Sequence, residues 1–98
     1  MNNTVDDLGR ALKPIINRAA KSECLHYIRV TTQGLMDMKS LRITVTCNAP
    51  NPDYAYRDAA ERNAMEVIGT AVAKWCAKRG SLVRMSTEGN RITVTLVD

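Results

Sequence analysis

The sequence predicts a two-layer α+β fold, in which a four-stranded antiparallel sheet carries two helices on one face. Three observations lead to it. The pentapeptide Arg-Ile-Thr-Val-Thr occurs twice, at residues 42–46 and 91–95. A helical pattern precedes each copy, and a further strand-like segment lies between that helix and the pentapeptide. The order αββαββ indicates an internal duplication within a single domain, residues 1–98, with one repeat over about 4–47 and the other over about 53–97.

The first helix is expected from Thr4 to Ser22. Thr4 offers a side-chain oxygen to the free N–H groups of a first helical turn, and Asp7 follows three residues later. Apolar residues then share one helical face, namely Leu8, Leu12, Ile15 and Ala19. Pro14 interrupts this pattern because it has no N–H to donate and its ring crowds the carbonyl four residues back. We expect a kink at Pro14, or a break with a second short helix.

The strands and the second helix follow from the period of the apolar residues. Alternation of apolar and polar residues predicts strands over 25–32, 41–47, 82–86 and 91–97. An apolar stripe predicts the second helix over 53–79, and Gly80 is typical of the residue that closes a helix. Short connections within each strand pair favour antiparallel pairing, which leads to the four-stranded sheet.

Composition and charge describe an ordinary globular chain with a basic balance. The 98 residues are 45% hydrophobic and 24% charged, with a net charge of +4. No apolar run approaches the roughly 18 residues that a membrane span requires, and the first residues lack the pattern of a secretory signal. We therefore expect a cytoplasmic protein with no membrane partner. The three cysteines, an odd number at wide spacing, favour reduced thiols over disulfides.

Few residues are available for catalysis or metal binding. The single histidine, His26, lies two residues after Cys24 on the expected first strand, so the two share a strand face, but no third group orients the imidazole. Asp53, Asp58 and Glu61 near the start of the second helix alternate with arginines, which favours solvated charge over a metal site. No paired-cysteine motif or phosphate-binding glycine loop occurs. The sequence predicts no enzyme, no metal site and no cofactor.

The sheet face turned away from the helices is the first candidate site. Alternation places four arginines and six hydroxyl residues there, together with one tyrosine: Arg29, Arg42, Arg84, Arg91, Thr31, Thr44, Thr46, Ser86, Thr93, Thr95 and Tyr27. Such donors suit phosphates or carboxylates, so this face is a candidate for binding nucleic acid or an acidic protein. Two arguments oppose it. Threonine is common on exposed strands, and only Tyr27 is available there to stack on a base.

An apolar insertion in the first repeat is the second candidate site. Six residues, Leu35 to Ser40, have no counterpart in the second repeat, and Leu35, Met36 and Met38 are apolar. These side chains either fold over an end of the core or contact another protein or a second copy of the chain.

The sequence therefore favours a small non-catalytic binding module. The first-ranked function is a protein-binding adaptor, or an inhibitor or regulator of a larger assembly. A protein of this kind could be encoded by a mobile element. The alternative is a nucleic-acid-binding domain. The unpaired edges of the sheet add a route to a homodimer.

Overall fold

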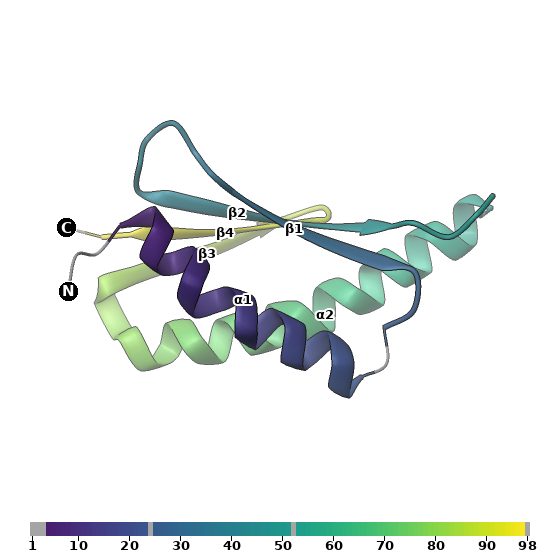
Figure 1. Cartoon of the computed structure of the whole chain (residues 1–98), viewed down its shortest axis with the longest axis horizontal. Helices are drawn as coiled ribbons and strands as arrows, with labels where there is room; N and C mark the ends of the chain where they lie inside the picture. Colours follow the sequence, from purple (N-terminus) through teal and green to yellow (C-terminus); the bar gives the residue numbers. More distant parts are fainter. Residues whose placement is uncertain (1–3, 24, 52, 98) are drawn as a thin grey trace.

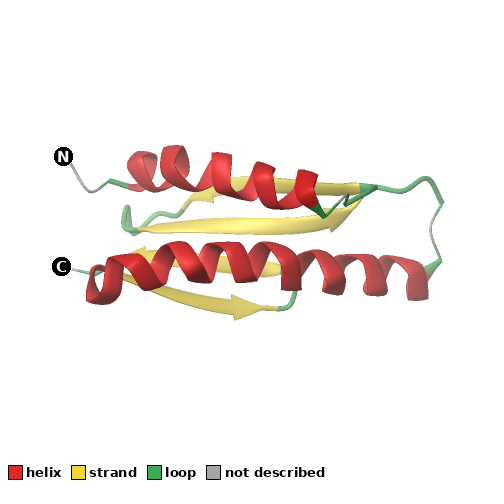
Figure 2. Ribbon diagram, turned by 90° about the horizontal axis from the view of Figure 1, so that it is seen from below, coloured by secondary structure: helices red, strands yellow, loops and turns green. Residues whose placement is uncertain are grey.

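The structure, a computed structural model, describes residues 4–23, 25–51 and 53–97. It confirms the α+β class, with a four-stranded antiparallel sheet and two helices (Figure 1). Both helices lie on the same side of the sheet (Figure 2). The elements in chain order are α1 (Val5–Ser22), β1 (Ile28–Gly34), β2 (Ser40–Cys47), α2 (Tyr54–Arg79), the 3-10 turn η1 (Gly80–Leu82), β3 (Val83–Glu88) and β4 (Arg91–Leu96).

The two copies of the repeated pentapeptide form the centre of the sheet. The strand order is β1-β2-β4-β3, so β2 and β4 pair with each other. Ile43 lies opposite Ile92, which occupies the same position of the pentapeptide. On either side of this pair, Arg42 lies opposite Thr93 and Thr44 lies opposite Arg91, so each strand pairs its arginine with the first threonine of the other copy. The pairing is therefore symmetric about the two isoleucines.

Helix α1 starts as its sequence predicts and continues through its proline. The Thr4 hydroxyl oxygen accepts from the Asp7 N–H at 3.2 Å, and the Asp7 carboxylate accepts from the Thr4 N–H at 3.2 Å, which forms a capping box. No break or second helix occurs at Pro14. The structure differs from the expected apolar face at one position: the buried residues are Leu8, Leu12 and Ile16, whereas Ile15 is half-buried.

Helix α2 has the predicted ends. Asp53 accepts from the Tyr56 N–H at 2.7 Å, and Gly80 follows the last residue with φ 60°, a conformation that favours glycine. Its buried residues are Ala64, Ile68 and Val72. At the edge of the helix, Glu61 accepts from the N–H of Cys47 at 2.8 Å, so its carboxylate joins α2 to the end of β2.

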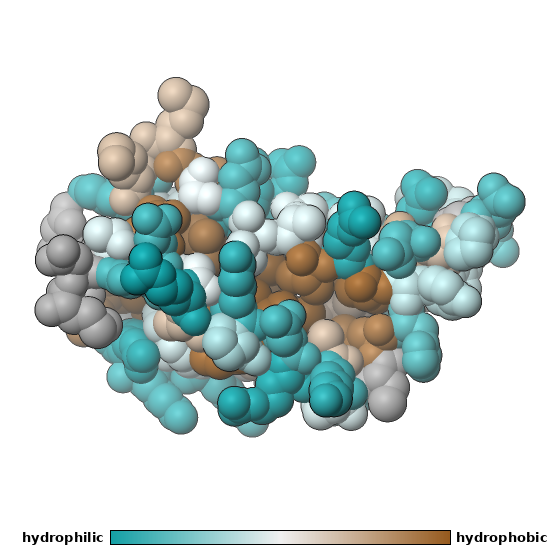
Figure 3. Space-filling view, in the orientation of Figure 1, coloured by the Kyte–Doolittle hydropathy of each residue, from teal (hydrophilic) through white to brown (hydrophobic). Residues whose placement is uncertain are grey.

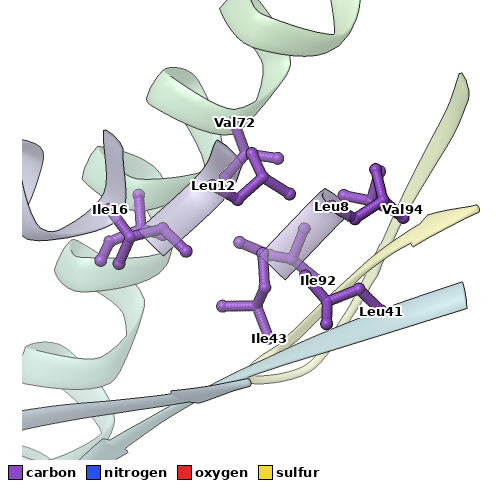
Figure 4. Packing of buried hydrophobic residues seen from close by; sticks show 9 residues of the cluster. Leu8, Leu12, Ile16, Leu41, Ile43, Val72, Ile92 and Val94 are labelled. Atoms are coloured by element: carbon purple, nitrogen blue, oxygen red, sulfur yellow. The ribbon is translucent and has the colours of Figure 1, made fainter. Parts of the chain in front are cut away.

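The core lies between the helices and the inner face of the sheet (Figure 4). Leu12 of α1, Ile68 of α2, and the paired Ile43 and Ile92 have no solvent exposure. Val45, Val72 and Val94 are likewise fully enclosed. Apolar burial of this kind is the dominant favourable term in folding, so the alternate residues of β2 and β4 anchor both helices to the sheet.

The bounds of β1 and β3 differ most from the expected ones. Strand β1 begins at Ile28 and not Leu25, because Tyr27 adopts φ 58° in a turn that precedes the strand. Strand β3 begins at Val83, after η1, and continues to Glu88, because Gly89 with φ 58° and Asn90 suffice to make the turn into β4. Strand β1 correspondingly extends to Gly34.

Candidate functional site

One face of the sheet remains open in the described part of the chain. Both helices pack on the opposite face (Figures 1 and 2). The core-facing residues from Leu41 to Cys47 on β2, and Ile92 and Val94 on β4, are buried, whereas the residues between them are half-buried or exposed. The pattern is the alternation predicted from sequence, and it presents the predicted arginines to solvent on this open face.

The four arginines, here called the arginine face, are spread over the sheet in a regular way. The strand register divides the open face into four successive cross-strand rows, and each row contains one arginine. Along the strands the order is Arg29 on β1, Arg91 on β4, Arg42 on β2 and Arg84 on β3. Rows two residues apart lie about 7 Å from each other, so the arginines span roughly 20 Å.

The arginine face repeats the symmetry of the central strand pair. A half-turn about Ile43 and Ile92 exchanges β2 with β4 and β1 with β3. The same half-turn brings the position of Arg42 onto that of Arg91, and the row of Arg29 onto the row of Arg84. The cationic pattern is therefore nearly the same from either end.

Most of the chain's excess charge lies on this face. Among the described residues, four arginines and one carboxylate, Glu88, leave +3 there, against a net +4 for the whole chain. Two ion pairs among the described residues, Arg10 with Asp7 and Arg62 with Asp58, lie on helices. None of the four face arginines has an ion pair within residues 4–23, 25–51 and 53–97.

Hydroxyl groups separate the arginines on the open face. Thr31 lies opposite Thr44, and Thr93 lies opposite Ser86, while Thr46 and Thr95 occupy the outer rows. Within the described part of the chain, Thr95 alone of these six uses its hydroxyl in a hydrogen bond, with Ser40 Oγ at 2.9 Å. The other five hydroxyls are available to donate to an acceptor brought to the face.

At one end of the sheet, the loop between β1 and β2 projects into solvent (Figures 1 and 3). Met36 is completely exposed and Met38 is 80% exposed, whereas Leu35 is half-buried. Of the two alternatives for this insertion, folding over the core is thus wrong for Met36 and Met38. The loop presents two flexible apolar side chains to solvent.

The projecting loop is braced by Asp37. One carboxylate oxygen accepts from the N–H groups of Lys39 and Ser40, both at 2.9 Å, and the other accepts from Ser40 Oγ at 2.7 Å. The Ser40 hydroxyl first, and then the Lys39 N–H, hold the pKa of Asp37 below its ordinary value of 3.8. Ser40 is buried although it lies on the open face, because the loop and Thr95 enclose it.

A cleft of about 530 Å³ opens beside this loop, where the start of α1 meets the end of α2. Its apolar lining includes Met38, Trp75, Leu82, Val83 and Leu96. The Arg79 guanidinium lies over the Trp75 ring, 4.3 Å from the centroid. We call Met36, Met38, the exposed Leu82 and this cleft the apolar end.

The remaining candidates from sequence are not brought together as a site. His26 and Tyr27 lie in a turn, so the shared strand face expected for Cys24 and His26 is wrong, and Cys24 itself lies outside the described residues. Asp53 caps α2, while Asp58 pairs with Arg62. Across residues 4–23, 25–51 and 53–97, no three possible ligands gather around a metal position.

The two described thiols are poorly placed for reaction. Cys47 is buried, and Cys76 is half-buried. Burial raises the pKa of the Cys76 thiol, and the charge of Arg79 offsets part of that rise.

Sequence reasoning missed the other two tyrosines, Tyr54 and Tyr56, which are exposed in the first turn of α2. It also missed the Trp75 and Arg79 contact, although their spacing of four on a helix is a usable signal. Among the described helices none is long and apolar enough to cross a membrane. Comparison of the chain with protein-family models, curated proteins and solved structures gives no match.

Proposed function

We propose that the protein is a small non-catalytic binding module that holds nucleic acid on the open face of its sheet. The observation that carries the proposal is the uneven charge: +3 of the net +4 lies on the arginine face. A chain that placed its arginines only to solvate exposed strands would be expected to intersperse carboxylates among them. Here the other described carboxylates lie on the helices and loops instead.

The chemistry of this face suits a phosphate backbone. A guanidinium donates two parallel hydrogen bonds to a phosphate, and neighbouring hydroxyls add further donors. One arginine per row offers up to four such contacts over roughly 20 Å. We place the module in the cytoplasm, where buried thiols such as Cys47 stay reduced.

Titration of labelled oligonucleotides tests the proposal. Fluorescence anisotropy with a single strand and with a duplex should show binding that weakens as salt rises from about 50 to 200 mM. Four phosphate contacts to a single strand predict a slope of log K against log salt of about −2.8. Arg42→Ala combined with Arg91→Ala should lower the affinity and reduce the magnitude of that slope by about 1.4.

A matched pair of lysines provides the control. Lys74→Ala with Lys78→Ala removes the same charge from exposed positions of α2, in the helical layer. This variant should keep most of the affinity. Equal losses in both double variants, or binding to an acidic polypeptide but to no oligonucleotide, would overturn the assignment of the sheet face to nucleic acid.

A second candidate function, docking of a partner protein, is favoured by the apolar end. Met36 projects completely exposed from a loop that Asp37 braces, beside an apolar cleft. Exposed methionines adapt to apolar partner surfaces, so an apolar segment of another protein is the expected occupant. The protein would then act as an adaptor, inhibitor or regulator, with Leu35 shaping the base of the loop.

Serine replacements in the loop separate the two functions. Met36→Ser with Met38→Ser should abolish capture of a protein partner from the native host while leaving oligonucleotide affinity unchanged. Capture that survives these replacements, but is lost in the double arginine variant, would assign the partner to the sheet face instead.

We further infer that the chain arose by duplication of an αββ unit. The central pairing of equivalent isoleucines supports this inference. So do the buried triplets of the helices, Leu8, Leu12 and Ile16 against Ala64, Ile68 and Val72, which are related by a constant offset of 56, close to the offset between β1 and β3.

Pairing of two copies through β1 is the proposed route to a homodimer. Strand β1 is at the edge of the sheet, contains no proline and has Arg29 as its one charged residue. Strand β3, the opposite edge, has two charged residues in six. Sedimentation of the wild type and of Thr31→Lys, a replacement at an exposed position, should show whether a β1-mediated dimer exists, because a lysine on that strand disfavours pairing.

A further inference from the structure

Three of the chain's four aromatic residues are exposed, and they lie at the end of the molecule opposite the apolar end. Tyr27 is 55% exposed, Tyr54 83% and Tyr56 45%. The fourth aromatic, Trp75, contributes to the cleft at the apolar end. A tyrosine buries a large apolar area when it packs into a core, so three exposed rings at one end call for an explanation beyond packing.

Hydrogen bonds fix the backbone that carries Tyr27 and Tyr56. The Tyr27 carbonyl accepts from the Asn48 N–H at 2.8 Å, which fixes the turn before β1 to the end of β2. The Tyr56 N–H donates to Asp53 at 2.7 Å, so the first turn of α2 is capped. Tyr54 and Tyr56 are two residues apart, which directs their rings to different sides of the helix and leaves each ring free of the other.

The arginine face begins at the same end. Arg29 occupies the first row, opposite Thr46, and the pairing of Tyr27 with Asn48 is the next step along the same two strands. The first turns of α2 project past the end of β2, at the level of the strands rather than below them (Figure 1). A chain of nucleotides laid on the four rows would therefore leave the sheet at the end of the molecule that carries the three tyrosines.

We propose that this tyrosine end, defined as Tyr27, Tyr54 and Tyr56, stacks unpaired bases, and that the substrate class is single-stranded nucleic acid. This inference rests on the proposed binding of phosphates by the arginine face. Every base offers a π-face to an aromatic ring, so stacking tolerates any sequence, whereas paired bases inside a duplex cannot reach the rings. The arginines account for the salt-dependent binding of phosphates, and the tyrosines account for the preference for single-stranded over double-stranded nucleic acid.

Three probes of matched length test the inference: a labelled oligothymidylate, a duplex, and an abasic strand that has phosphates without bases. The wild type should bind oligothymidylate more tightly than the abasic strand or the duplex. Tyr54→Ala should lower oligothymidylate affinity about 5- to 150-fold if one base stacks on that ring. The same replacement should leave the affinity for the abasic strand and the salt slope unchanged. Tyr54→Phe, which keeps the ring, should bind oligothymidylate like the wild type. Tyr27→Ala is the second test variant.

Met36→Ala is the matched control, because it removes an exposed side chain from the opposite end. Equal wild-type affinity for all three probes, with no effect of either tyrosine variant, would overturn the stacking inference while arginine-dependent binding left the proposed function intact. Absence of arginine-dependent binding to every probe would overturn the proposed function, and the stacking inference with it. Circular dichroism melts show whether each variant is folded.

Discussion

The two faces of the central strands carry different residues of the repeated pentapeptide, and these residues have different roles. On the inner face, Ile43 and Ile92 are fully buried and Val45 and Val94 flank them. On the open face, Arg42 and Arg91 have no ion pair within the described residues. Core packing explains the identity of the inner residues, but it does not explain why arginine occupies the outer positions. The contrast separates residues that maintain the fold from residues available to a ligand, and replacements on each face should show it.

The largest effect should follow replacement on the inner face. Ile43→Ala or Ile92→Ala removes fully buried methyl and methylene groups and leaves a cavity, so each should lower the free energy of unfolding by about 2–5 kcal/mol. Urea denaturation measures it. A loss below about 1 kcal/mol would mean that the helices collapse onto the gap and that the inner face is less tightly packed than the burial indicates.

Ser40 tests the one place where the open face is closed. Its hydroxyl bonds Asp37 and Thr95, and it is buried beneath the loop. Ser40→Ala should lower the free energy of unfolding by about 0.5–1.5 kcal/mol, because the half-buried Thr95 hydroxyl loses its hydrogen-bond partner. Thr46→Ala, on the exposed part of the same face, is the control and should change stability by less than about 0.5 kcal/mol.

Acidification should loosen the loop before it affects the sheet. The folded-state pKa of Asp37 is lowered, so the stabilisation from its ionised form is present above the ordinary pKa of 3.8 and is lost as the pH falls through the lower folded value. Amide exchange at Lys39 and Ser40 should accelerate in that acidic window, since both N–H groups donate to Asp37. Asp37→Asn should abolish most of this pH dependence.

The smallest effect on stability should come from the arginine face. Arg42→Ala with Arg91→Ala should change the free energy of unfolding by less than about 1 kcal/mol in total, because surface replacements away from special contacts are usually within about 0.5 kcal/mol each. Thermal melts of this variant and of the lysine control should nearly coincide. A large destabilisation would show that these arginines maintain the sheet, and would remove the distinction between the two faces.

Much of this arrangement follows from local sequence patterns. Alternation predicts which residues of β2 and β4 face the core, and capping chemistry predicts the starts of both helices at Thr4 and Asp53. The start of β1 was not predictable, because the turn depends on positive φ at Tyr27, which its residue type does not favour. The choice of Ile16 over Ile15 depends on how α1 packs, since both lie near the same helical face.

The candidate site was predictable to a similar degree. The four arginines were placed by strand parity alone, but their distribution over four rows requires the order β1-β2-β4-β3, which no local pattern encodes. Tyr54 and Tyr56 were missed because an aromatic in a first helical turn is buried or exposed according to how far the helix extends past the sheet. That distance depends on the tertiary structure and cannot be read from the local sequence.

The symmetry of the central strand pair has a consequence for direction. Because a half-turn about Ile43 and Ile92 exchanges the positions of Arg42 and Arg91, a strand entering from either end of the sheet meets an equivalent series of cations. The arginine face by itself therefore cannot distinguish the 5′ from the 3′ end of a bound chain. The tyrosines have no counterparts at the opposite end, where Met36 and Met38 project instead. Under the proposed binding mode, those three rings give the complex its polarity.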